Sequence, residues 1–218
     1  YKRQAFSRSI FDTEWGWDMV DNDALADDSE FPNGSFSHGT HVGSTISMLN
    51  DGLDGNGMAA RVTPIRVCAG GCPGSATYGA YLYLNGDAND SLTTFAQRSA
   101  GQKLHSVNMS YGGSGGSATS ASCVKLGELA DRGVLIASSS GNSGIGSVGW
   151  PSSCPRVYSV GATNGTDRRS SYSSTNEYVA FSAPGGEYSD WNADGIDDLV
   201  YAYARDDSYV QTLSLIHI

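Results

Sequence analysis

The spacing of apolar residues along the chain predicts two amphipathic helices. In the first, apolar residues recur three and four positions apart behind the polar segment SHGTHVGS, so this helix should begin near His38. The second has one apolar face and ends at Gly133, in the position that glycine usually takes after a helix. The apolar positions are Val42, Ile46 and Leu49 in the first helix and Cys123, Leu126, Leu129 and Ala130 in the second.

Short apolar runs between polar loops predict strands. We expect strands at residues 61–67, 104–109 and 134–138, a further helix at 76–84, and an acidic, solvated loop at 15–28. Strands that alternate with helices indicate an α/β fold: a three-layer, mostly parallel, doubly wound sheet with helices on both faces. Ligands of such sheets bind at the carboxyl ends of the strands, where residues 110–113 and 141–142 fall.

Length and charge limit the functions to consider. A chain of 218 residues without internal repeats is expected to form one domain. Its formal net charge of -10 argues against nucleic-acid binding, which needs a basic surface. No apolar stretch approaches the length of a membrane span, so we expect no membrane partner. We also expect the protein to be a monomer.

His38 is the first candidate for chemistry. An imidazole at the first turn of a helix is presented to solvent, and its pKa near neutrality suits a general base. Two alternatives remain open. The histidine can be structural, or His38 and His41 can be two metal ligands on one helical face, although no Glu or Cys stands at a recognised ligand spacing from them.

Four segments follow one another in an order that carries a family resemblance. They are SHGTHVGS from Ser37, SVNMSYGG from Ser106, VLIASSSGNSG from Val134, and the runs VYSVGAT and VAFSAPG within residues 157–185. This order resembles the subtilisin-like serine proteases and covers the chain from about Gly16 to Gly186. The resemblance implies a subtilisin-like fold, here incomplete.

The resemblance also implies roles for individual residues. His38 corresponds to the catalytic base and Asn142 to the asparagine that donates a hydrogen bond to the oxyanion. Two further sets correspond to substrate-binding segments, one that pairs with the substrate backbone and one that walls the pocket for the residue before the cut. They are Ser110, Tyr111, Gly112 and Gly113 in the first set and Ser138, Ser139, Ser140 and Gly141 in the second.

Two members of the expected catalytic triad have no counterpart. The family's orienting aspartate lies in a D-T-G or D-S-G motif; Asp12 has Glu14 in place of the glycine, and we do not assign it this role. No G-T-S-M-A motif is present for the nucleophile, and Ser214 does not match it. We therefore expect residues 1–212 to be part of a peptidase domain whose catalytic Asp and Ser lie outside the chain. Residues 213–218 are interpreted as a non-native tail from adapter read-through.

The four cysteines are even in number, which suits disulfides in an oxidising compartment. Cys123 and Cys154 would flank the strand and turn that carry Asn142, and Cys68 and Cys72 could close a small surface ring. A metal site is the rival interpretation, but the cysteine spacing is loose and the histidines lie elsewhere.

Calcium is the one metal that the sequence suggests, as a structural ion. The segment DWNADGIDD resembles an insert of some secreted relatives, and its D-x-N-x-D-G start offers Asp190, Asn192 and Asp194 as ligands. Tyr201 stands where a helix-loop-helix calcium site would need Glu. The chemistry itself requires no cofactor.

We therefore expect part of a secreted, extracellular serine endopeptidase that acts on peptide or protein substrates. The 218-residue chain should itself be inactive, because a base without its nucleophile can activate only water. The alternative is a non-catalytic subtilase-like binding or structural module with calcium loops. A metal-dependent hydrolase that uses His38 and His41 is a more distant third.

Overall fold

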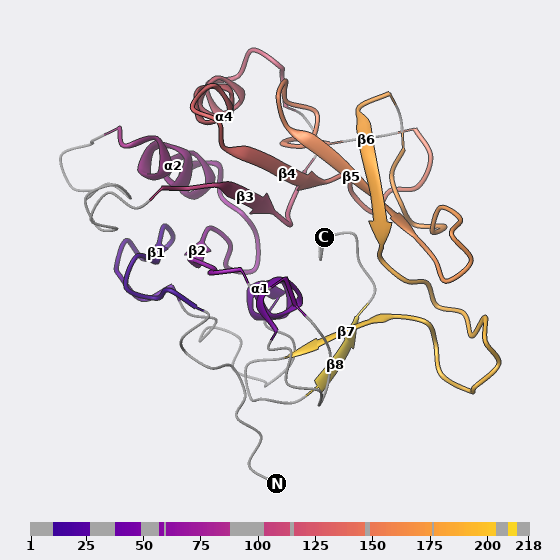
Figure 1. Cartoon of the computed structure of the whole chain (residues 1–218). Helices are drawn as coiled ribbons and strands as arrows, with labels where there is room; N and C mark the ends of the chain where they lie inside the picture. Colours follow the sequence, from indigo (N-terminus) through magenta and orange to yellow (C-terminus); the bar gives the residue numbers. More distant parts are fainter. Residues whose placement is uncertain are drawn as a thin grey trace, which may run out of the picture. The chain divides into compact units, whose positions relative to one another are not determined.

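The computed structural model describes residues 11–26, 38–48, 57–58, 60–87, 103–113, 116–146, 149–175, 177–203 and 209–212 (Figure 1). The chain divides into two compact units, one of residues 1–103 and 201–210 and the other of residues 104–200 and 211–218. Each unit contains parallel strands and at least one helix.

The first unit contains β1 (Trp17–Asp18), α1 (His38–Ser47), β2 (Ile65–Arg66) and α2 (Gly74–Asn85). β1 and β2 are parallel, with Trp17 opposite Ile65. The expected solvated loop at residues 15–28 was therefore wrong in part, because Asp18 lies in a strand and is 1% exposed. Its carboxylate accepts hydrogen bonds from Val20 N at 2.7 Å and from the Arg66 guanidinium, which compensates the buried charge.

Aromatic side chains fix α2 against β1. The Tyr83 ring stacks with the Trp17 ring at 6.3 Å between centroids, and the Tyr83 hydroxyl donates to the carbonyl of Trp15 at 2.7 Å. Tyr81 and Tyr83 are each 1% exposed. A buried tyrosine needs a hydrogen-bond partner for its hydroxyl, and the backbone of the β1 segment provides it for Tyr83.

The second unit is built on a four-stranded parallel sheet with the order β3-β4-β5-β6. The helix α4 (Ala121–Asp131) connects β3 to β4 and contacts β4 (Figure 1). Leu126 and Leu129 of α4 are fully buried, as their helical spacing predicts. The strands are β3 (Ser106–Met109), β4 (Leu135–Ser139), β5 (Tyr158–Thr163) and β6 (Val179–Pro184).

Among the described residues, irregular segments connect β4 to β5 and β5 to β6, and small or polar residues make up most of both stretches. One expectation about this sheet was wrong in detail. The sequence VAFSAPG was expected to be a core strand, but β6 is the edge of the sheet and Phe181 is 58% exposed. The expected α/β fold with parallel strands and helices is confirmed.

The remaining strands, β7 (Val200–Tyr203) and β8 (Tyr209–Thr212), form a separate two-stranded sheet. Among the described residues, no helix is both long and apolar enough to cross a membrane. The tail at residues 213–218 and the segment 1–10 lie outside the described residues.

Candidate active site

The two histidines of α1 lie in different surroundings. His38 is the first residue of the helix, as predicted, and is only partly buried. His41, almost one turn further on, is fully buried. Of the two imidazoles, only that of His38 is therefore placed to exchange a proton with a molecule that arrives from solvent.

The burial of His38 and His41 does not support a metal site that both histidines share. A catalytic metal needs ligands around an open coordination position, whereas the ring of His41 is fully buried. In the parts of the chain that the structure describes, no group of three or more His, Cys, Asp or Glu side chains could hold an ion. The third function considered above thus rests on sequence spacing alone.

Asn142 lies at the exposed tip of the turn that follows β4. Gly141 before it has φ of 104°, a backbone conformation that residues with a side chain rarely adopt. The Gly141 carbonyl accepts a hydrogen bond from Ser174 N at 2.9 Å, and the Ser140 hydroxyl donates to the Ser174 carbonyl at 2.8 Å. The carboxyl end of β4 is thus fixed while the side chain of Asn142 stays exposed.

The segment that contains Ser174 holds the rest of this turn. The Ser174 hydroxyl accepts a hydrogen bond from Ser143 N at 3.0 Å, and Gly144 N donates to the carbonyl of Tyr172 at 2.9 Å. An oxyanion donor is effective when its position is fixed before charge develops, since no reorganisation is then needed during the reaction. These contacts give the Asn142 turn that kind of rigidity.

Gly141→Ala is expected to lower the free energy of unfolding by about 1–3 kcal/mol, because the positive φ would be strained. The added methyl group would also lie 3.1 Å from the Ser174 hydroxyl. Gly127→Ala is the matched control: a methyl group there meets nothing within 4 Å, and alanine favours the helix α4 by about 0.5–1 kcal/mol. Urea unfolding followed by circular dichroism measures both. Equal changes in the two variants would contradict the role given to the turn.

Part of the segment 110–113, which is predicted to pair with the substrate backbone, forms backbone hydrogen bonds within the protein. Gly113 forms an antiparallel bridge with Trp150, with N–O distances of 2.9 and 3.0 Å. Ser110 is 9% exposed, and its hydroxyl accepts a hydrogen bond from the Asn108 amide at 2.8 Å. The ring of Tyr111 lies 6.4 Å from that of Trp150. Pairing with a substrate strand therefore stays a prediction, with Gly113 committed to Trp150.

The serines predicted to wall the pocket before the cut are buried at the end of β4. Ser138 and Ser140 are 1% exposed and Ser139 is 8% exposed. Nothing in their surroundings tests a substrate pocket at this place, so the pocket stays a prediction.

A hollow of about 450 Å³ opens beside Asn142. It combines aromatic rings with one carboxylate, that of Glu187. The Tyr172 hydroxyl donates to the Gly185 carbonyl at 2.9 Å, and burial raises the pKa of this phenol, so it stays neutral. The residues that line the hollow are Asn142, Ser171, Tyr172, Glu187, Tyr188, Ser189 and Trp191.

Both oxygens of Glu187 are held by hydrogen bonds. Ser171 N donates to Oε1 and the Asn164 amide donates to Oε2, each at 2.8 Å. The bond from Ser171, followed by that from Asn164, holds the pKa of Glu187 below its usual value. This carboxylate is therefore a fixed negative charge at neutral pH.

The loop predicted to bind calcium is organised by its own side chains. Asp190 accepts hydrogen bonds from Asp194 N at 3.0 Å and Gly195 N at 2.7 Å, and the Asn192 amide donates to Asp194 at 2.9 Å. These bonds define a tight turn without identifying an ion. Calcium binding by Asp190, Asn192 and Asp194 stays a prediction.

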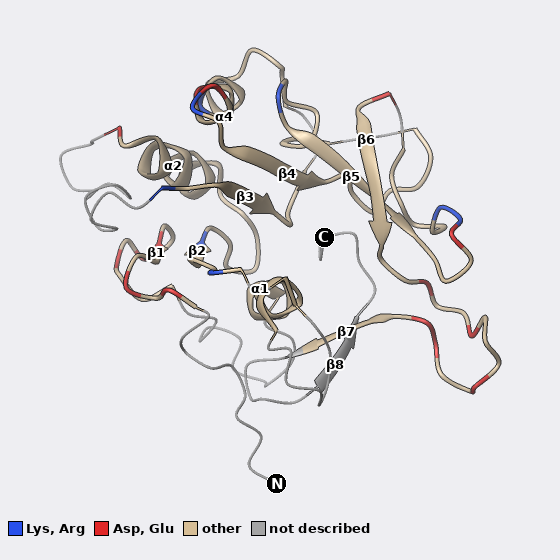
Figure 2. Ribbon diagram, in the orientation of Figure 1, with Lys and Arg blue, Asp and Glu red and all other residues tan. Residues whose placement is uncertain are grey.

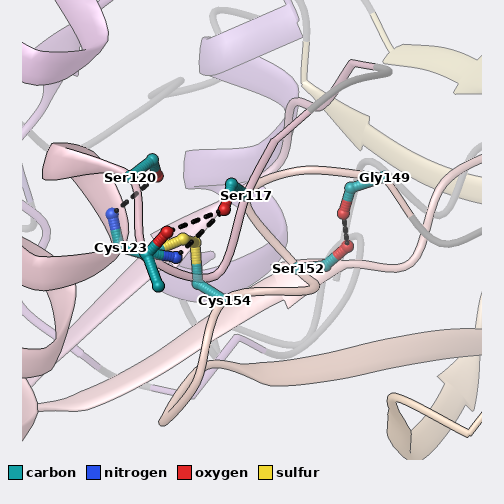
Figure 3. Close-up of a disulfide and its surroundings, with 7 residues drawn as sticks. Ser117, Ser120, Cys123, Gly149, Ser152 and Cys154 are labelled. Carbon is teal, nitrogen blue, oxygen red and sulfur yellow. Dashed lines mark hydrogen bonds between the residues drawn. A yellow bond between two sulfur atoms is a disulfide. The ribbon is translucent and has the colours of Figure 1, made fainter.

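Both expected disulfides are confirmed. Cys68 bonds Cys72, and Cys123 bonds Cys154. Figure 3 shows the second bond beside the first turn of α4, where the Ser120 hydroxyl caps the helix by accepting from Cys123 N at 3.3 Å. This bond ties the helix before β4 to the segment before β5, on either side of the Asn142 turn.

Sequence reasoning missed three residues of this region. Ser174 fixes the Asn142 turn, and Glu187 and Trp191 line the hollow. Ser174 was missed because it lies far along the chain from Asn142. Glu187 and Trp191 were missed because the sequence pattern shows no charge partner near them. The one signal in the sequence was the density of acidic and aromatic residues after Gly186.

Comparison with known proteins identifies the family of the chain. Residues 1–212 match the model of the Subtilase family. Alkaline elastase YaB of Bacillus sp. (strain YaB) is 34% identical over 148 residues, 68% of this chain and 36% of the relative. Subtilisin Savinase of Lederbergia lenta is 32% identical over 151 residues, again 68% of this chain and 50% of the relative. The matches thus span between about a third and a half of these relatives' lengths.

Solved structures give the same fold. A cold adapted subtilisin-like serine proteinase matches 96% of this chain and 63% of its own with a TM-score of 0.69 at 24% identity. A protease from Pseudoalteromonas arctica matches 100% of this chain and 79% of its own with a TM-score of 0.73 at 21% identity. At this level of identity they show the fold alone. Together with the family match, they show that the chain belongs to the subtilase family.

Proposed function

We propose that this chain contributes the general base and one oxyanion donor to a serine endopeptidase. The observation that carries the proposal is the Asn142 turn, in which an exposed asparagine lies on a backbone fixed by Ser174 at the carboxyl end of a parallel strand. The names of the relatives, an elastase and several subtilisins, support peptide-bond hydrolysis as the reaction.

In the proposed mechanism, a serine hydroxyl attacks the carbonyl carbon of the scissile peptide bond while the His38 imidazole takes its proton. The carbonyl oxygen becomes an oxyanion that accepts a hydrogen bond from the Asn142 side-chain amide. The imidazolium then protonates the leaving amine, and the peptide bond breaks to leave an acyl-enzyme. Water, deprotonated by His38, hydrolyses that ester and regenerates the serine.

We place the nucleophilic serine and the orienting aspartate outside these 218 residues. Asp12, the one upstream residue with part of the motif, is 6% exposed and forms an ion pair with Arg61 at 2.8 Å. The ion pair with Arg61 gives Asp12 a structural role. The 218-residue chain alone should therefore hydrolyse no peptide.

Asn142→Ala tests the proposal in a longer form of the protein that carries the serine and aspartate motifs. Loss of the donor should reduce kcat by about a hundredfold or more with little change in KM, which is the size of the effect measured on subtilisin itself. The rate of hydrolysis of a peptide anilide, measured with and without a serine-directed inhibitor, gives kcat. Ser143→Ala is the control in the same turn. An undiminished kcat would exclude Asn142 from the oxyanion site.

The alternative, a non-catalytic module, makes the opposite prediction for a longer form of the protein. It requires that the serine motif and the D-T-G motif be replaced by other residues. Peptidase activity that a serine-directed inhibitor abolishes would exclude the module.

The proposal also includes the partners and the location of the enzyme. Substrates are peptides or proteins, neither nucleic acid nor membrane is involved, and the enzyme acts as an extracellular monomer. No cofactor takes part in the chemistry, and any calcium at Asp190, Asn192 and Asp194 would have a structural role only.

A further inference from the structure

The hollow beside Asn142 lies on a definite side of the proposed cleavage site. The strand order is β3-β4-β5-β6, and residues 110–113 follow β3 while Asn142 follows β4. The other residues that line the hollow follow β5 and β6. The hollow therefore begins at Asn142 and extends away from residues 110–113, so it is the space open to the part of a peptide that follows a scissile carbonyl held at Asn142.

The lining of the hollow suits a cation. Glu187 holds a fixed carboxylate there, and Tyr172, Tyr188 and Trp191 line the same hollow, with Tyr188 and Trp191 71% and 51% exposed. Ammonium and guanidinium groups are attracted both to a carboxylate and to the faces of such rings. An apolar side chain would have to desolvate the carboxylate without compensation.

The surrounding charge has the same sign. The segment from Gly185 to Tyr203 contains no Lys or Arg and five acidic residues, which Figure 2 shows in red along the loop between β6 and β7. Charges of one sign that line a surface raise the local concentration of the opposite ion. The five residues are Glu187, Asp190, Asp194, Asp197 and Asp198.

The Arg169 guanidinium acts against this attraction. Arg169 lowers the pKa of Glu187 through its charge, so it offsets part of the negative potential. Its guanidinium donates to the carbonyls of Ser170 and Ser173 at 3.0 and 2.8 Å, which holds it in its own segment. It does not line the hollow, so the space beside Glu187 is left to an external cation.

We propose that this hollow binds a lysine or arginine side chain from the part of the substrate that follows the cut. Glu187 pairs with the cationic group and Trp191 contacts it through its ring. The proposal rests on the proposed peptidase function and adds a substrate preference to it.

The test is a binding measurement on the 218-residue chain, which needs no catalysis. The probes are Nα-acetyl-lysine N-methylamide and its uncharged analogue, Nα-acetyl-norleucine N-methylamide. Shifts of the Ser171 backbone amide report on binding, because this amide donates to Glu187. From the size of an exposed ion pair and a cation–π contact, the lysine probe should bind about tenfold more tightly.

Three variants separate the local contact from general attraction. Glu187→Gln should bring the two probes to within about twofold of each other, whereas Asp197→Asn, an equal loss of charge in the same loop outside the hollow, should keep the preference. Glutamine retains only one acceptor for Ser171 N and the Asn164 amide, so thermal unfolding of that variant is checked. Trp191→Leu leaves the carboxylate and should weaken the lysine probe by about threefold.

Equal binding of the two probes by the unmodified chain would overturn the proposal. An equal loss of the preference for the lysine probe in Glu187→Gln and Asp197→Asn would also overturn it. A parallel measurement in a longer form of the protein that carries the serine and aspartate motifs compares kcat/KM for substrates with lysine or norleucine after the cut. Cleavage without preference overturns this inference and leaves the peptidase function standing. Absence of all cleavage rejects the peptidase function, and the binding result still decides whether the hollow recognises cations.

Discussion

His38→Ala is expected to reduce kcat of the proposed peptidase by about 10⁶, which is the size of the effect measured for the corresponding histidine of subtilisin itself. Without the imidazole, the serine keeps its proton during attack and the leaving amine receives none. The same change should alter the free energy of unfolding by at most about 1 kcal/mol, because His38 is partly exposed at the first position of α1. Peptide anilide hydrolysis and urea unfolding measure the two effects.

His41→Ala provides the matched control in the same helix. The ring of His41 is fully buried, so its removal leaves a cavity and should lower the free energy of unfolding by about 2–4 kcal/mol. Activity of the folded fraction should change far less than in His38→Ala. If His41→Ala abolished activity without loss of stability, the assignment of the base to His38 would be wrong.

Local patterns in the sequence were sufficient to predict α1, which holds these histidines, and α4. The start of α1 at His38 follows from small and polar residues before a helical apolar pattern. The buried face of α4, with Leu126 and Leu129, follows from the same kind of periodicity. These predictions succeed because residues that are close in sequence decide them.

The contacts that shape the candidate site depend on residues far apart in the chain. Ser174 reaches back to Ser143, 31 positions earlier, and Asn164 reaches forward to Glu187, 23 positions later. Neither pair has a spacing that a helix or a strand imposes, so no periodicity reveals it. The buried Asp18 escaped prediction for the same reason, because its partner Arg66 lies 48 residues further on.

Removal of the Cys123–Cys154 disulfide by a double change to alanine is expected to lower the free energy of unfolding by about 3–4 kcal/mol. The bond joins residues 31 positions apart, and its loss returns the conformational freedom of that segment to the unfolded chain. The segment includes β4 and the Asn142 turn. Urea unfolding under oxidising conditions, with the slope compared between variants, measures the change.

The Cys68–Cys72 disulfide is the matched control, because it closes a ring between residues only 4 positions apart. On the same chain-entropy account its removal should lower the free energy of unfolding by about 2 kcal/mol. The larger ring should also have a local effect that the smaller one lacks. Hydrogen exchange at Gly144 N, which bonds the Tyr172 carbonyl, should accelerate more when Cys123 and Cys154 are replaced. Equal losses of stability and equal exchange in the two variants would show that the larger disulfide does not support the Asn142 turn.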